Sequence, residues 1–228
     1  DRRSGASGSG AFGDPAPGVR VVERIPPAAV PADAVGGGRF VRSISYGPGG
    51  GGPGDTTGLL RAMVEAQAEG AVLAMLIDAE SAAAAHAAGE GASLTLDLGG
   101  KEFPGDQPFR AQCRVLKLGD GVFTATGPMW GGARMALGKM ALVETGGVRV
   151  VLASKSMQAG DTSMLRHLGI EPAEEHLIGL KSSVHFRADF EPLAEAVLVV
   201  EAPGPVYADP AKLEFVNLRP GVRLTPGG

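Results

Sequence analysis

Residues 47–57 read Gly-Pro-Gly-Gly-Gly-Gly-Pro-Gly-Asp-Thr-Thr, and an amphipathic helical pattern begins directly after them. Glycine has no Cβ, so its N–H groups can turn toward a ligand, and a helix N-terminus adds partial positive charge. The spacing from Gly49 to Gly54 matches the phosphate loop of nucleotide hydrolases, but Asp55 stands where that loop has its lysine. A carboxylate there would repel a triphosphate. We therefore interpret Asp55 as the N-cap of the helix, and the loop as a segment beside a ligand or a neighbouring domain.

The composition is that of a globular protein with few aromatic residues. The chain has 228 residues, of which 44% are hydrophobic and 5% aromatic, so Ala, Val and Leu must build its core. A formal net charge of -4 argues against a surface for nucleic acid or anionic membranes. The single Cys113 excludes an internal disulfide and a cysteine metal cluster, which favours a reducing, cytoplasmic location.

No segment of the sequence indicates export or membrane insertion. The longest apolar run, residues 71–77, is far too short to span a bilayer, and no secretion signal opens the chain. The chain begins at Asp1, so we expect a fragment or a processed piece.

The first 45 residues differ in composition from the rest. They are rich in Gly and Pro and lack a sustained strand or helix period, apart from possible short strands at 19–22 and 40–45. We expect residues 1–45 to be an irregular segment, disordered or not native to the domain, and residues 46–228 to form an α/β domain. The domain's periodic part begins with a helix over 55–69, a strand over 71–77 and an Ala-rich helix capped by Asp78 and ending at Gly89.

The middle of the chain has the alternating pattern of antiparallel strands. These are expected at 93–98, 109–118, 122–126, 134–144 and 148–154, with a tight hairpin at residues 145–147. The end returns to a helix over 162–168 capped by Asp161, a strand over 177–181, a short helix from 184 and a strand over 196–201. The predicted fold class is α/β: a mixed sheet flanked by helices with an inserted antiparallel β section.

Few side chains have the spacing of a self-contained catalytic or metal site. None of the four histidines forms a ligand pair of the His-x-x-x-His kind. We interpret His86 as a surface residue, His167 as a cation at a helix C-terminus, and His176 as a residue without distinctive neighbours. Cys113 is expected to be a buried, inert thiol, and a Ser154–Lys155 nucleophile pair has little support. Trp130, within a glycine turn, could line a pocket or simply pack.

Residues 181–187, Lys-Ser-Ser-Val-His-Phe-Arg, stand out because they follow an apolar strand directly. In open α/β sheets, ligands bind at the carboxyl ends of the strands, where Lys181, His185 and Arg187 would converge. The alternative interpretation is a capped helix with exposed basic residues.

The order of several motifs resembles the C-terminal domain of the MlrC-like metallopeptidases, a family named for microcystinase C. The resemblance covers about residues 49–219, and its motifs are residues 49–61, 96–101, 120–123, 127–129, 137–138, 150–154, 169–172 and 181–190. It implies a zinc-dependent hydrolase of peptide or amide bonds, with microcystin degradation as the activity that names the family. In that family the metal ligands belong to an N-terminal domain, which this chain does not contain.

The resemblance therefore implies that this chain alone is inactive, holds no metal and has no catalytic residue of its own. One zinc ion would be expected in the full-length enzyme, and the partners would be the missing N-terminal domain and a peptide or amide substrate. The residues expected at the substrate cleft are Gly52, Gly54, Asp55, Thr56, Thr57, Lys181, His185 and Arg187. The rival interpretation is a non-catalytic module that binds small anions with the glycine loop and the helix N-terminus.

The chain departs from the family pattern just before the glycine loop. The family's Asp-Asn-Pro-Gly lead is replaced by residues 46–49, Tyr-Gly-Pro-Gly, so acidic and amide side chains are missing there. Upstream of about Ser45 the chain does not resemble the family. Our hypothesis that this stretch is not native family sequence would be refuted by an intact metal domain upstream in the same reading frame.

Overall fold

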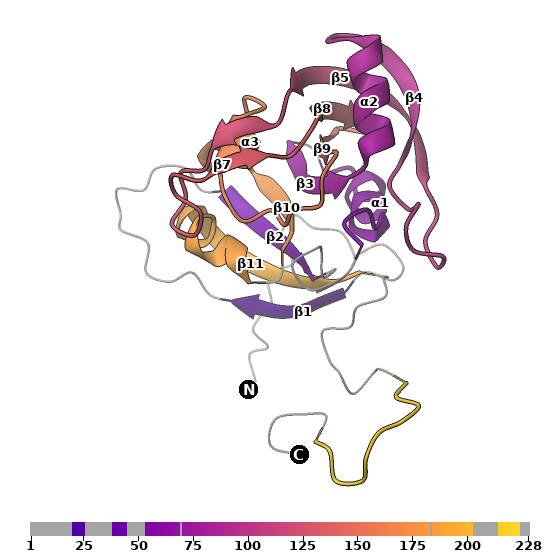
Figure 1. Ribbon diagram of the computed structural model, residues 1–228, viewed down its shortest axis with the longest axis vertical. Coiled ribbons are helices and arrows are strands. Elements are labelled where there is room, and N and C mark those ends of the chain that lie inside the picture. Colours follow the sequence, from indigo (N-terminus) through magenta and orange to yellow (C-terminus); the bar gives the residue numbers. More distant parts are fainter. Residues whose placement is uncertain are drawn as a thin grey trace, which may run out of the picture.

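The computed structural model describes residues 20–25, 38–44, 53–68, 70–182, 184–202 and 214–223. In this part of the chain a nine-stranded mixed sheet carries helices, and a two-stranded sheet stands beside it (Figure 1). The large sheet consists of β1 (Arg20–Ile25), β2 (Gly38–Ile44), β3 (Ala71–Ile77), β4 (Ser93–Leu98), β5 (Phe109–Gly119), β8 (Met140–Thr145), β9 (Val148–Ala153), β10 (Leu177–Lys181) and β11 (Ala194–Glu201). The small sheet pairs β6 (Val122–Thr124) with β7 (Arg134–Ala136). The expected α/β class with an antiparallel section is confirmed.

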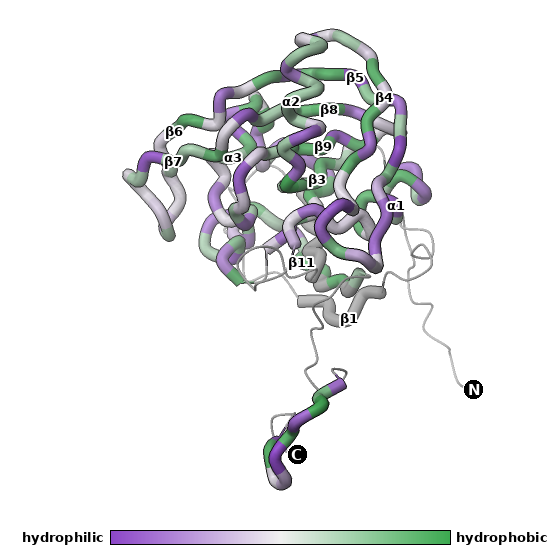
Figure 2. Tube along the Cα trace, turned by 45° about the vertical axis from the view of Figure 1, so that its right-hand side comes forward, coloured by the Kyte–Doolittle hydropathy of each residue, from purple (hydrophilic) through white to green (hydrophobic). Residues whose placement is uncertain are grey.

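The large sheet has a parallel part and an antiparallel part. Its strand order is β1-β11-β2-β10-β3-β9-β8-β5-β4. The strands β11, β2, β10, β3 and β9 run parallel to their neighbours within this group, whereas β8, β5 and β4 continue the sheet as antiparallel strands. Every residue of β3 is buried, as expected for a central strand covered on both faces. Figure 2 shows the hydrophobic character of β3, which agrees with this burial.

Helices and loops cover both faces of the sheet and create two hydrophobic cores. One core packs α1 (Gly58–Glu65) and α2 (Ala79–Ala88) against Leu73 and other sheet residues on one face. The other core packs α3 (Ser163–Arg166), the small sheet and the 3-10 helices η3 (His185–Ala188) and η4 (Glu191–Leu193) against the opposite face. A further 3-10 helix, η2 (Pro172–Glu174), precedes β10.

Several expected boundaries differ from the structure. The strand expected over 134–144 is two strands, because Gly138 has a positive φ of 69° and the chain turns there from the small sheet into the large one. The helix expected from Asp55 begins only at Gly58, and the one expected over 162–168 is confined to Ser163–Arg166. The hairpin expected at residues 145–147 is confirmed, with φ of 55° at Gly146 and 80° at Gly147.

The first 45 residues contribute two strands to the sheet. β2 lies between β10 and β11, and β1 pairs with β11 in antiparallel register. The short strands expected at 19–22 and 40–45 therefore exist, each with shifted ends. The rest of this segment lies outside the described residues, and a domain boundary at residue 45 stays a prediction.

Within the described ranges, none of the helices has the length and apolar character that a membrane span requires.

Leu73 offers a test of the central strand. Its side chain is fully buried under α1, so Leu73→Ala should lower the free energy of unfolding by roughly 2–5 kcal/mol, because it removes buried methyl groups and leaves a cavity. Chemical denaturation with circular dichroism measures the change. The control Thr124→Ala, on an exposed position of β6, should stay within roughly 0.5 kcal/mol of the parent. Equal effects of the two substitutions would contradict the assignment of β3 to the core.

Candidate functional site

The segment 53–57 lies across the carboxyl ends of two neighbouring parallel strands. The backbone N–H of Ile77, the last residue of β3, donates to the Gly54 oxygen over 3.1 Å. Lys181, the last residue of β10, reaches the same oxygen with its side chain. Segment 53–57 thus occupies the edge of the sheet where open α/β folds bind ligands.

Lys181 is a buried clamp on this segment. Its side chain is 2% exposed, and Nζ donates to the Gly54 oxygen over 2.8 Å and to the Thr56 carbonyl oxygen and Oγ1 over 3.0 Å each. Desolvation lowers the pKa of Lys181 to about 7, although the negative charges of Asp55, Asp106 and Glu102 act in the opposite direction. The amino group is therefore committed to the loop and does not lie open as a cation on the surface.

Asp55 does not cap α1, which corrects the expectation from the sequence. The N-cap residue is Thr57, and the Asp55 carboxylate turns instead toward the β4–β5 connection. Its Oδ2 accepts hydrogen bonds from the N–H groups of Lys101 (2.6 Å) and Glu102 (2.9 Å), and its carbonyl oxygen accepts one from Gly100 (2.8 Å). Three successive N–H groups therefore converge on one residue, as in the backbone nests that bind anions.

Two glycines make this nest possible. Gly99 and Gly100 have positive φ values of 56° and 65°, which other residues rarely adopt. A Cβ on Gly99 would lie 2.2 Å from the Asp55 carbonyl oxygen. The other carboxylate oxygen of Asp55, Oδ1, is buried and accepts no hydrogen bond within the described part of the chain.

The β4–β5 connection also supplies a carboxylate, from Asp106, that accepts hydrogen bonds from segment 53–57. Asp106 accepts hydrogen bonds from the Thr57 N–H over 2.7 Å and from Thr57 Oγ1 over 2.6 Å. This places a negative charge at the start of α1, where the helix dipole favours one. Arg61 closes the contact by donating to the carbonyl oxygens of Gln107 (2.8 Å) and Pro108 (3.0 Å). We call residues 53–57 and 99–108 together the loop clasp.

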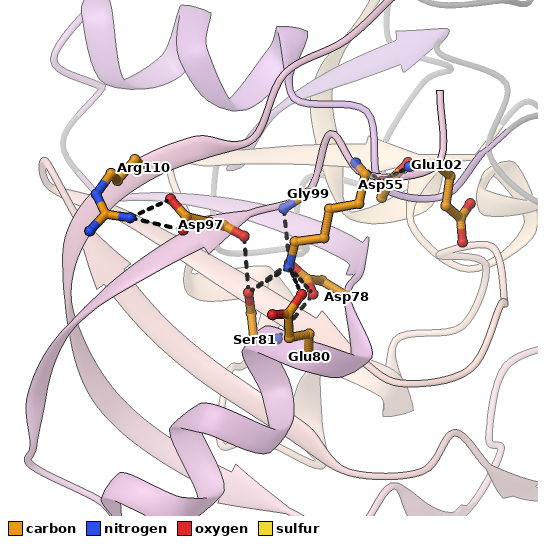
Figure 3. A network of polar contacts seen from close by, with 9 residues as sticks. Asp55, Asp78, Glu80, Ser81, Asp97, Gly99, Glu102 and Arg110 are labelled. Atoms are coloured by element: carbon orange, nitrogen blue, oxygen red, sulfur yellow. Dashed lines mark hydrogen bonds and ion pairs between the residues drawn. The ribbon is translucent and has the colours of Figure 1, made fainter. Parts of the chain in front are cut away.

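A second polar network fastens the loop clasp to α2 (Figure 3). Asp78 caps α2, as the sequence predicted, by accepting a hydrogen bond from the Ser81 N–H over 3.0 Å. Lys101 Nζ lies 2.9 Å from Asp78 Oδ1 and 3.0 Å from Glu80 Oε2. Burial alone would raise the pKa of Asp78, but hydrogen bonds from Ser81, Lys101 and the Gly99 N–H hold this pKa below its usual value.

His185 and Arg187 have other partners. His185 Nδ1 lies 2.8 Å from Gln158 Oε1, and Arg187 forms an ion pair with Glu191 over 2.9 Å. The connection to the loop clasp runs through Ser182, next to Lys181, whose hydroxyl donates to Gln158 Oε1 over 3.4 Å. Side chains of successive residues in extended backbone point to opposite sides, which explains why Lys181 and Ser182 serve different groups.

The structure thus joins Gly54, Asp55, Thr56, Thr57 and Lys181 in one cluster, and Gly52 lies outside the described residues. Asp55, Thr57 and Lys181 are almost inaccessible, so in this structure they fix the shape of the clasp. Direct contact of these residues with a substrate stays a prediction, as it does for His185 and Arg187.

The other candidates have structural partners. His86 donates from Nε2 to the Met140 oxygen over 2.9 Å, linking α2 to β8. His167 Nε2 lies 3.0 Å from the Gly121 N–H and 3.5 Å from Asp120 Oδ1, so its ring links the end of α3 to the β5–β6 turn. Burial raises the pKa of Cys113 to about 11, in line with an inert thiol. Ser154 donates to the Lys139 oxygen, which leaves the Ser154–Lys155 pair without support.

Sequence reasoning did not single out Asp106 or Lys101 as site residues. Lys101 belongs to the motif 96–101, which enters the sequence analysis through the family resemblance alone. The adjacent glycines 99–100 were the available signal, because a glycine pair after a strand indicates a backbone that presents N–H groups.

An α/β domain with a mixed sheet and a loop clasp at the carboxyl ends of its strands defines the class of this protein. The family model described as MlrC C-terminus matches residues 47–217, and the chain belongs to this family. Microcystinase C from Sphingomonas sp. is 29% identical over 158 residues, which is 68% of this chain and 30% of the relative. A candidate metallopeptidase from Mesorhizobium sp. BNC1 has the same fold, with a TM-score of 0.65 and 24% identity over 73% of this chain and 34% of that one. The chain thus spans about a third of the length of these relatives.

The residues that the structure describes do not fit a metal centre. Among them, no group of three or more His, Cys, Asp and Glu side chains is arranged to hold an ion.

The burial of Lys181 predicts a specific pH dependence of stability. The pKa of this group is about 7 in the folded state and near 10.5 when unperturbed, so between these values the unfolded chain binds a proton that the folded chain has lost. Stability rises with pH wherever the unfolded state binds more protons. The free energy of unfolding of the parent minus that of Lys181→Met should therefore rise from pH 7 to about pH 10. The difference cancels the contribution of Cys113, and a flat difference would contradict the burial.

The variant Asp106→Ala tests the contact between the Asp106 carboxylate and Thr57 in the loop clasp. Loss of the acceptor for the Thr57 N–H and hydroxyl should lower the free energy of unfolding by roughly 1–3 kcal/mol. The matched control is Gln107→Ala, since this exposed neighbour engages the clasp only through its backbone. Denaturant titration measures both variants, and an Asp106→Ala variant as stable as Gln107→Ala would refute the role of Asp106.

Proposed function

We propose that this chain is the C-terminal domain of a zinc-dependent hydrolase of peptide or amide bonds, and that it helps to form the substrate cleft. The observation that carries the proposal is the loop clasp, which a buried lysine fixes at the ligand-binding edge of the sheet. The membership of the family supports the reaction class. Zinc would be held by an N-terminal domain, and the substrate would be a peptide or amide small molecule.

The loop clasp has the properties of a preorganised wall. Each of its two segments places a carboxylate on backbone N–H groups of the other. Lys181 joins segment 53–57 to β10, and Lys101 joins segment 99–108 to α2. A rigid wall holds a substrate in one orientation without an entropic cost at the time of reaction. In this proposal Asp55, Thr56 and Thr57 shape the wall, while His185 and Arg187 lie nearer the substrate. The enzyme would work in the cytoplasm.

The rival proposal, a module that binds small anions, has less support. The Asp106 carboxylate lies at the start of α1, and Asp55 fills the nest at residues 100–102 with its carboxylate and its carbonyl oxygen. Lys181 is engaged by carbonyl and hydroxyl oxygens. The groups that would attract an anion are therefore occupied by the chain itself. Calorimetry with phosphate or acetate distinguishes the two proposals, because binding that disappears in Arg187→Ala would favour the module.

The proposal predicts that the purified chain binds no stoichiometric zinc and hydrolyses no peptide. The reason is that the described residues provide no three-ligand site. Elemental analysis after dialysis against zinc, together with an assay on a linear peptide, measures both properties. Tight one-to-one zinc binding, or turnover by the chain alone, would refute the assignment of the metal to another domain.

A further inference from the structure

One ring nitrogen of His185 has no partner among the residues that the structure describes. Its Nδ1 lies 2.8 Å from Gln158 Oε1, and the same oxygen accepts the Ser182 hydroxyl over 3.4 Å. An amide oxygen can only accept, so Nδ1 carries the hydrogen and the neutral ring keeps its lone pair on Nε2. Within the described ranges Nε2 has no hydrogen-bond partner, and the side chain is half-buried. Gln158 thus orients His185 as an acceptor.

An indole lies beside this imidazole. The ring centroids of Trp130 and His185 are 6.5 Å apart, and the planes are tilted by 43°. Gly160 permits this arrangement, because a Cβ there would lie 2.9 Å from the Trp130 ring and 3.4 Å from the His185 Cβ. The contact therefore depends on a residue without a side chain.

Exposed apolar side chains stand next to both rings in the sequence. Val184 precedes His185 and is 57% exposed, and Met129 precedes Trp130 and is 43% exposed. The charged groups near them are already paired: Arg187 with Glu191, and the Asp161 and Asp189 carboxylates with backbone N–H groups of residues 127 and 162. Nε2 thus offers a free acceptor beside exposed apolar side chains, a combination that suits a ligand with a hydrogen-bond donor and an apolar group.

We propose that His185 and Trp130 form a binding site for the apolar residue of a peptide-like ligand. His185 Nε2 accepts an amide N–H of the ligand, and the apolar side chain packs on Trp130, Met129 and Val184. The site lies on the side of the β10 end that Ser182 faces, opposite the contacts of Lys181. The peptide-like nature of the ligand rests on the proposed function. The acceptor rests on the contact between His185 and Gln158, and the apolar surface rests on the exposure of Val184 and Met129 beside the two rings in sequence.

Trp130 is the only tryptophan of the chain, so its fluorescence reports on this site directly. The probe is N-acetyl-leucine methylamide, compared with N-acetylglycine methylamide. The leucine probe should change the emission of Trp130 saturably and shift the His185 Nε2 resonance in the 15N spectrum. His185→Gln should weaken its binding by about tenfold, the usual effect of losing one hydrogen bond from a bound ligand. No saturable change, or equal binding of the two probes, would overturn the site.

Two further variants keep the test decisive. His176→Gln changes an exposed histidine and should leave binding of the leucine probe unaltered. Val184→Ser, at an exposed position, should weaken binding of the leucine probe and not of the glycine probe; an unchanged preference would overturn the apolar contact. These measurements use no zinc and no turnover, so the site can fail while the hydrolase proposal stands, and the reverse.

Discussion

A buried amino group must find hydrogen-bond acceptors, and this requirement organises the loop edge of the domain. The Lys181 side chain is buried at the end of β10, and leaving its N–H donors without hydrogen bonds there would destabilise the folded state. Two carbonyl oxygens and one hydroxyl of segment 53–57 supply the acceptors. Two carbonyls can take the two N–H donors of a neutral amine, and the Thr56 hydroxyl can then donate to its lone pair. The clamp therefore suits either protonation state of the lysine.

The position of segment 53–57 in turn determines what its neighbours can do. Asp55 is placed so that its carboxylate meets two N–H groups of the β4–β5 connection and its carbonyl oxygen meets a third. The same connection brings the Asp106 carboxylate to Thr57. The glycine-rich loop suggested an anion site from the sequence. The anions at this edge are instead the Asp55 and Asp106 carboxylates of the chain itself. Their hydrogen bonds hold segments 53–57 and 99–108 together.

Periodicity predicted the strands and the fold class well because these depend on local patterns. The apolar run 71–77 became a central strand, Asp78 capped α2, and the glycines at 146–147 formed a hairpin. The role of Asp55 was missed for a physical reason. Its partners, Lys101 and Glu102, lie in a different loop, and no local spacing encodes such a contact. Likewise, the strand over 134–144 read as continuous because Gly138 interrupts no hydrophobic alternation.

The strand order places β10 between β2 and β3, although β10 is made long after both. During synthesis β2 and β3 must wait with open edges, and such edges are prone to pair with other chains. Lys181 belongs to this late strand and lies 127 residues after Gly54, whose oxygen it binds. A strand that inserts between two earlier ones is therefore also the one that locks the loops, so this edge becomes rigid only after Lys181 has been synthesised.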